Sequence, residues 1–160
     1  MSGDKNFYDN LPKKRMGAGC LFFNENGHVM LVKPSYKPTW EIVGGIVEKD
    51  ESPKSACERE IAEEIGLSRK VNRLLVVDYN NYPDDKTKTE SLMFVFDGGV
   101  LSADDIAQIH LQEKELFGYQ FFSPDALPDN LQPVLAKRIH MAIMQRGMDG
   151  AVYLENQQII

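Results

Sequence analysis

The sequence has little cysteine, no long apolar run and no excess of positive charge. Its two cysteines, Cys20 and Cys57, give no disulfide framework pattern. No apolar stretch reaches the roughly 18 residues of a membrane-spanning helix, and no secretory signal pattern opens the chain. The formal net charge is −6, whereas nonspecific binding of nucleic acid or anionic membranes needs a basic surface. We therefore expect a cytoplasmic protein without nucleic-acid or membrane partners.

The remaining composition is typical of one globular domain. The hydrophobic fraction is 42% over 160 residues, which is enough to form a packed core. Residues 1–14 are polar and show no clear period, so we expect an N-terminal arm there. We expect residues 15–160 to form a single domain.

Strand and helix signals are mixed along residues 15–160. The apolar runs 17–23 and 28–33 flank an Asn-Gly turn and predict a hairpin. A short strand is expected at 40–43, ending on two glycines, and residues 102–111 are expected to form a short strand or a turn. Further strands are predicted in 69–81, 89–100 and 119–122, and helices in 53–65 and 131–147.

This order lacks the regular alternation of a doubly wound parallel sheet. It favours an α/β fold in which a mixed β-sheet lies between helices, as an α/β/α sandwich. The apolar tail at 151–160 is expected either to dock on the domain or to form an edge strand.

The helix expected at 53–65 has clear end signals and two distinct sides. Ser52 suits the N-cap, Pro53 the first helical position and Gly66 the C-terminal cap. At about 100° per residue, the apolar side chains share one side, which we expect to face the core. Three acidic side chains share another side next to Arg59: Glu60, Glu63 and Glu64.

Helix physics disfavours this acidic side. Like charges at i, i+3 and i, i+4 each cost a few tenths of a kcal/mol, and the later half of a helix is slightly unfavourable for negative charge. A hard divalent cation would offset this repulsion, because Mg²⁺ and Mn²⁺ prefer carboxylate and carbonyl oxygens. The glycines at 44 and 45 would let the backbone approach such a site closely.

The stretch from Gly45 to Leu67 resembles the signature of the Nudix hydrolases. Gly45 is followed after five residues by Glu51, and after seven more by the run Arg-Glu-Ile-Ala-Glu-Glu-Ile-Gly-Leu at 59–67. Seven fixed positions at roughly one in fifteen each make a chance match about one in 10⁸. Many relatives have proline before the glycine pair, where this chain has Val43. The resemblance implies a Nudix-like fold and hydrolysis of a nucleoside diphosphate linked to another group X.

The resemblance also implies roles for individual residues. Glu60, Glu63 and Glu64 are expected to bind Mg²⁺ or Mn²⁺, with the Gly44 carbonyl as a helper. Arg59 is expected to pair with Glu51 and hold the preceding loop against the helix, close to the catalytic centre. The residue that orients or deprotonates the attacking water is expected to be one of three glutamates: Glu60, Glu113 or Glu115.

The identity of X is not contained in this motif. Weak candidates for substrate contacts are Trp40, Tyr36 and Lys33, through base stacking or phosphate pairing. Nucleoside triphosphates, ADP-ribose, dinucleoside polyphosphates and sugar nucleotides all remain open. An alternative is a nucleotide-sensing module of the same fold without turnover. A homodimer is a further expectation from the resemblance.

Overall fold

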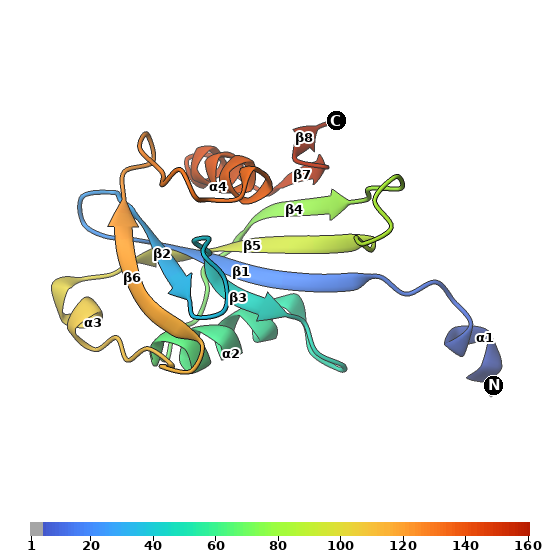
Figure 1. The fold of residues 1–160 in the computed structure, drawn as a ribbon, viewed down its shortest axis with the longest axis horizontal. Coiled ribbons are helices and arrows are strands. Elements are labelled where there is room, and N and C mark those ends of the chain that lie inside the picture. The colour runs from blue at the N-terminus through green and yellow to red at the C-terminus, as the bar shows by residue number, and fades with distance from the viewer. Residues whose placement is uncertain (1–4) are drawn as a thin grey trace.

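The computed structural model describes residues 5–160 as helices and strands around one sheet (Figure 1). The helices are α1 (Lys5–Asp9), α2 (Pro53–Ile65), α3 (Ala103–Ala107) and α4 (Pro133–Arg146). The strands are β1 (Arg15–Phe23), β2 (Val29–Pro34), β3 (Val43–Ile46), β4 (Leu74–Asn80), β5 (Ser91–Val100), β6 (Leu116–Phe122), β7 (Val152–Glu155) and β8 (Gln158–Ile159). No helix of this described part is long and apolar enough to cross a membrane.

The sheet is mixed and has helices on both faces. Its strand order is β6-β2-β1-β5-β4-β7-β8, and β3 pairs with β1 beside this path. Helix α2 lies against one face and α4 against the other (Figure 1). The predicted α/β/α sandwich is therefore confirmed.

Strand β1 is the central element of the fold. It runs antiparallel to β2 and β3 and parallel to β5. Because strand side chains alternate between faces, Cys20 and Phe22 join the hydrophobic cluster under α2, whereas Leu21 and Phe23 join the cluster under α4. All four side chains are buried, so one strand contributes to both cores.

Helix α2 begins and ends where its sequence signals predict. The Ser52 side chain accepts a hydrogen bond from the backbone N–H of Ser55, and Pro53 occupies the first turn. Gly66 ends the helix with φ of 71°, in the left-handed conformation that glycine adopts without strain. The buried apolar face of α2 contains Ala56, Cys57, Ile61 and Ile65.

Three elements differ from the sequence-based expectation. Residues 102–111 contain helix α3 rather than the expected short strand or turn, because Ser102 and Asp105 form a reciprocal capping box at its start. Strand β3 begins at Val43 and includes both glycines, whereas Trp40 and Glu41 form only isolated bridges. The predicted N-terminal arm contains the short helix α1.

The apolar tail forms the strands β7 and β8, and β7 extends the sheet next to β4.

A buried polar network joins β4, α4 and the turn between β7 and β8. Asp78 is fully buried and accepts hydrogen bonds from Arg138 Nε and Nη2, at 3.0 and 2.8 Å. Gln157 donates its backbone N–H and its side-chain amide to the same carboxylate, each at 3.0 Å. The network gives hydrogen-bond partners to both buried charged groups. A single buried charge without such partners would be strongly destabilising.

Candidate active site

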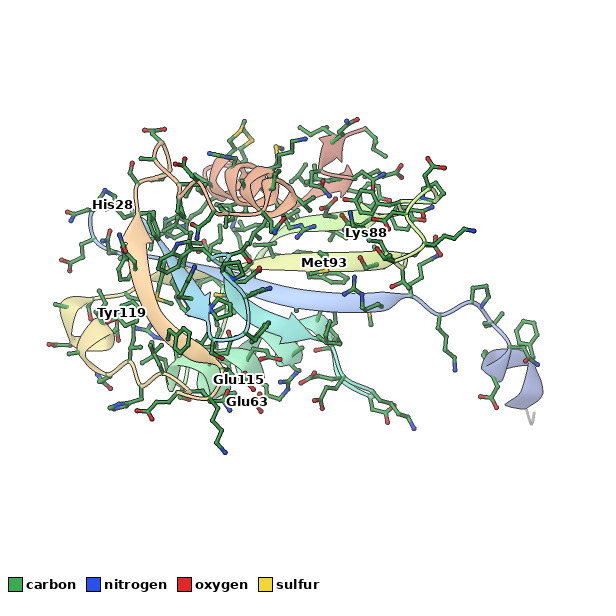
Figure 2. The ribbon with its side chains drawn as sticks, in the orientation of Figure 1. His28, Glu63, Lys88, Met93, Glu115 and Tyr119 are labelled. Atoms are coloured by element: carbon green, nitrogen blue, oxygen red, sulfur yellow. The ribbon has the colours of Figure 1, made fainter. Side chains whose placement is uncertain are left out.

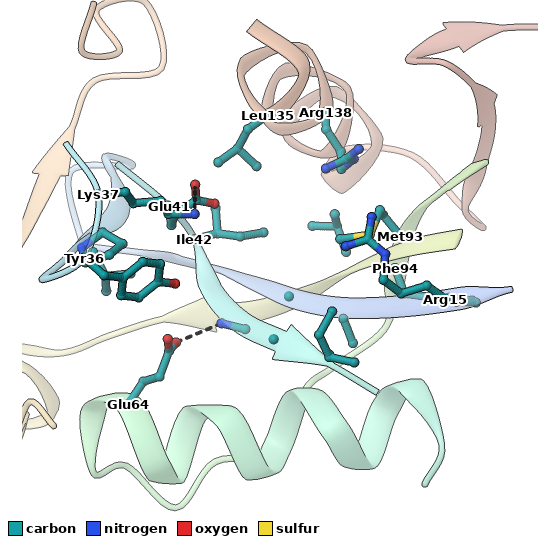
Figure 3. Close-up of a pocket in the computed structure, with 18 residues that line it drawn as sticks. Arg15, Tyr36, Lys37, Glu41, Ile42, Glu64, Met93, Phe94, Leu135 and Arg138 are labelled. Atoms are coloured by element: carbon teal, nitrogen blue, oxygen red, sulfur yellow. Dashed lines mark hydrogen bonds and ion pairs between the residues drawn. The ribbon is translucent and has the colours of Figure 1, made fainter. Parts of the chain in front are cut away.

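The carboxylate of Glu64 is the buried acidic group of α2. Only 9% of this residue is exposed, although it belongs to the acidic side of the helix. Its carboxylate accepts a hydrogen bond of 2.9 Å from the backbone N–H of Gly44, which joins α2 to β3 (Figure 3). Gly44 has φ of 148°, and a Cβ there would lie 2.3 Å from the carbonyl oxygen of Ala18. The close approach of β3 to β1, which places this N–H toward Glu64, therefore depends on glycine at this position.

The environment of Glu64 opposes its negative charge. Burial raises the pKa of Glu64 to about 8, and the charges of Glu60, Glu115 and Glu41 act in the same direction. The N–H of Gly44 opposes this effect only in part. A carboxylate in this situation is stabilised by a nearby cation.

Glu60 occupies the space that glycine leaves open at position 45. A Cβ on Gly45 would lie 2.2 Å from Glu60 Oε1 and 2.6 Å from its Cδ. Burial also raises the pKa of Glu60 above its usual value, although Arg59 acts in the opposite direction. The two consecutive glycines therefore serve separate purposes: Gly44 lets β3 approach β1 while its N–H binds Glu64, and Gly45 leaves room for Glu60.

Arg59 connects the acidic side of α2 to the preceding loop. Its Nε and Nη2 bind the two carboxylate oxygens of Glu51 at 2.9 and 3.1 Å, so the predicted ion pair is present. This pairing holds the pKa of Glu51 below its usual value. Arg59 Nη1 also binds Glu60 Oε1 at 2.8 Å and Glu63 Oε2 at 2.9 Å. One guanidinium thus compensates part of the charge of three carboxylates.

The side chains predicted to bind metal fit a divalent cation by their chemistry. Glu60, Glu63 and Glu64 offer hard oxygen ligands, and burial, with a smaller effect of neighbouring carboxylates, raises the pKa values of Glu60 and Glu64. Within residues 5–160, no three acidic, histidine or cysteine side chains already converge as a ligand set. A metal ion would have to compete with Arg59 for Glu60 and Glu63. Gly44 contacts the site through its amide, and a role for its carbonyl stays a prediction.

A cavity of about 410 Å³ lies next to Glu64 and the glycine pair (Figure 3). Its walls come from β1, β3, β5, the first turns of α4 and the segment 34–42. Of the three substrate candidates, Tyr36 lines this cavity. Trp40 instead packs edge-to-face on Phe122, with ring centroids 5.1 Å apart, and the Lys33 ammonium lies 5.3 Å from the Trp40 ring centre.

Three charged residues of this cavity were not among the sequence-based candidates: Arg15, Glu41 and Arg138. Lys37, which also lines it, is a lysine that the sequence suggests for phosphate contact. The sequence does contain an indication of Arg138, because this residue lies three positions after Leu135 on the apolar side of the helix. The structure shows that it is buried. A charged residue at such a position usually has a buried partner or a ligand.

The structure separates the two later glutamates. The charge of Glu115 contributes to raising the pKa values of both Glu60 and Glu64. Figure 2 shows Glu115 on the same side of the molecule as Glu63. The carbonyl of Glu115 also accepts a hydrogen bond from the Ser35 N–H at 2.7 Å, next to the cavity segment 34–42. Glu113 is not among the main charges acting on either carboxylate.

The space at Gly45 yields a prediction. Gly45→Ala is expected to lower kcat by about 10- to 100-fold with little loss of stability, because the new methyl displaces the Glu60 carboxylate rather than backbone. Steady-state kinetics and thermal unfolding would measure both effects. The control is Gly118→Ala in β6, where an added Cβ meets no atom within 4 Å. Equal activity of the two variants would contradict the placement of Glu60.

Comparison with known proteins identifies the family. The model of the NUDIX domain matches residues 13–141. A putative 8-oxo-dGTP diphosphatase of Bacillus subtilis (strain 168) is 31% identical over 126 residues, which are 78% of this chain and 76% of that protein. Diphosphoinositol polyphosphate phosphohydrolase 2 of Rattus norvegicus is 38% identical over 78 residues, which are 48% of this chain but only 42% of that protein.

Solved structures share the fold. A UDP-X diphosphatase superimposes with a TM-score of 0.73 at 24% identity, covering 96% of this chain and 76% of that one. The MutT protein of Methanosarcina mazei Go1 gives a TM-score of 0.68 at 24% identity, covering 88% of this chain and all of that one. Together with the domain match over residues 13–141, these similarities show that the chain belongs to the Nudix hydrolase family.

Proposed function

We propose that this Nudix hydrolase is a metal-dependent enzyme that cleaves the diphosphate linkage of a nucleoside diphosphate joined to another group X. The observation that carries the proposal is the buried Glu64 carboxylate at the wall of a cavity large enough for part of a nucleotide. Its pKa of about 8 marks a charge that the protein alone does not stabilise.

The metal ligands in this proposal are Glu60, Glu63 and Glu64, with the Gly44 carbonyl as a helper. When bound, Mg²⁺ or Mn²⁺ would neutralise charge on the phosphate oxygens and polarise the phosphoanhydride. Gly44 holds the Glu64 carboxylate in place through its N–H. Arg59 binds Glu51 in the loop before α2 and also binds Glu60 and Glu63, so it holds these two carboxylates next to that loop, while Glu64 lines the cavity.

The proton of the attacking water needs an acceptor close to these carboxylates. The charge of Glu115 acts on both Glu60 and Glu64, which favours Glu115 or Glu60 over Glu113 as this acceptor. On the substrate side, the exposed ring of Tyr36 lines the cavity, with the Lys37 ammonium 5.5 Å from its centre. Trp40 packs on Phe122, the Lys33 ammonium lies near the Trp40 ring, and neither is among the described residues that line the cavity, which supports Tyr36 as the stacking residue.

A substrate panel tests the proposal. The protein would be incubated with Mg²⁺ or Mn²⁺ and with 8-oxo-dGTP, ADP-ribose, UDP-sugars or dinucleoside polyphosphates, which include the classes named for its relatives. We expect two phosphate-bearing products from at least one member, and their identity locates the cleaved bond. Tight binding of a nucleotide without turnover would support the sensing module instead. Light scattering on the same purified protein would test the proposed homodimer. A cytoplasmic location is also part of the proposal.

The assignment of the water-activating group gives a separate prediction. Glu115→Gln is expected to lower kcat at least tenfold, because a charge next to Glu60 and Glu64 is lost. Glu113→Gln, in the same exposed segment, is the matched control and should stay within about twofold. If the two variants behave alike in steady-state kinetics, Glu60 becomes the remaining candidate.

A further inference from the structure

A second cavity, of about 280 Å³, adjoins the first. The two cavities share Arg15, Met93 and Arg138 among their lining residues. The two cavities therefore form one continuous space. It begins at Glu64, passes these three side chains and ends beside Lys88. Figure 3 shows Arg15 and Arg138 coming from opposite sides, one from β1 and one from α4.

The wall of the second cavity is basic in a protein whose net charge is −6. It contains Arg15, Lys88 and Arg138, and none of its described lining residues is acidic. Arg15 is exposed and forms no ion pair within residues 5–160. Lys88 lies 4.7 Å from the ring centre of Tyr82 and 3.2 Å from Asp85, in an exposed pair that water screens.

Arg138 keeps a free donor for this space. Its Nε and Nη2 bind Asp78, and Nη2 also reaches Asn80 at 3.4 Å. Its Nη1 has no hydrogen-bond partner in the described part of the chain. Every fully buried side-chain nitrogen in that part does have a partner, so Nη1 is not one of the fully buried atoms. Nη1 is therefore accessible, although the residue is only 7% exposed and lines both cavities.

Neutral groups complete a surface suited to an anion. Hydroxyl-bearing residues line the second cavity: Tyr82, Thr89 and Ser91. Val134, in the first turn of α4, lines it too, and the N-cap Gln132 provides no side-chain cap for this helix. Uncapped N–H groups at a helix start favour negative charge nearby.

We infer that Arg15, Arg138 and Lys88 form a second anion subsite, which binds a phosphate on the group X beyond the hydrolysed diphosphate. The inference rests on the proposed function for the orientation of the substrate, with its diphosphate at Glu64. It narrows the substrate class to nucleotides that carry a further phosphate at their far end. Arginine suits such a group because its guanidinium keeps its charge and donates directed hydrogen bonds to phosphate oxygens, and Asp78 holds the Arg138 guanidinium in place with Nη1 free.

The test measures binding of inorganic pyrophosphate to the metal-stripped protein by calorimetry in EDTA. Without metal, the glutamate cluster repels the probe, so binding reports the basic subsite. We expect saturable binding that weakens about tenfold or more in Arg15→Gln and in Lys88→Gln, and that weakens with added salt. Both side chains are exposed, so these variants keep the fold. Arg138 is not substituted in this test, because its removal would leave the buried Asp78 carboxylate without its ion-pair partner.

Two matched controls remove a positive charge outside the cavities. Lys137→Gln lies next to Arg138 on α4, and Lys86→Gln lies two residues before Lys88. Both should bind pyrophosphate within about twofold of the unmodified protein. Absence of binding, or equal losses in all four variants, would overturn the subsite. Binding of adenosine with the same dependence on Arg15 would also overturn it, in favour of a base pocket. Because the measurement needs neither metal nor turnover, its result is independent of whether the proposed hydrolysis is observed.

Discussion

Glu64→Gln is expected to lower kcat by about 10²- to 10³-fold while the protein remains folded. Glutamine keeps an oxygen that can accept the Gly44 N–H, so the link between α2 and β3 survives. It removes the negative charge that a divalent cation would bind. Loss of a buried, partly uncompensated charge does not destabilise the fold, because burial disfavours that charge from the start.

Glu63→Gln should show a similar loss of turnover, for a different structural reason. Glu63 has a half-exposed side chain and binds Arg59 Nη1, so its replacement leaves the core unchanged. Calorimetric titration with Mg²⁺ and Mn²⁺ should show weaker uptake in both variants. Glu25→Gln, in the hairpin turn, is the charge-matched control. Near-normal turnover in both Glu63→Gln and Glu64→Gln would refute the assignment of these ligands.

Asp78→Ala is expected to reduce the free energy of unfolding by about 3–5 kcal/mol. The substitution leaves the Arg138 guanidinium buried without its ion-pair partner and removes the acceptor for Gln157. For a domain of this size, such a loss corresponds to a decrease in Tm of roughly 10 °C. Denaturant titration and thermal unfolding would measure it.

The control for the buried ion pair is an exposed ion pair, Asp85 with Lys88. Asp85→Ala removes the partner of Lys88 at the surface and should change stability by no more than about 1 kcal/mol. The double variant Asp78→Leu with Arg138→Met should recover much of the lost stability, because no buried charge is left unpaired. A small effect of Asp78→Ala alone would mean that water reaches the pair.

Local signals in the sequence predicted α2 and the acidic side of the site. Ser52, Pro53 and Gly66 mark the ends of the helix within a few residues, and the spacing of the glutamates follows from the helical period. The ion pair between Arg59 and Glu51 also spans only eight residues. Each of these contacts is set by residues close together in the chain.

The cavity could not be predicted in the same way. Arg15 and Arg138 lie far apart in the sequence, and only the pairing of β1 within the sheet and the packing of α4 bring them to one space. Helix α3 differs from the cavity in this respect, because the Ser102–Asp105 capping box at its start is a local signal in the sequence. The aromatic ring of Trp40 suggests base stacking, but its packing on Phe122 depends on a strand 82 residues later and cannot be read from its neighbours in the chain.

The position of β1 between two cores has an evolutionary consequence. Each residue from Ala18 to Phe23 is buried, so substitutions there meet close-packed neighbours on one face or the other. We therefore expect substitutions that change side-chain volume along β1 to destabilise the fold. The loops at 34–42 and 81–90 carry no such constraint from both sides, and new substrate preferences would arise most readily through changes in them.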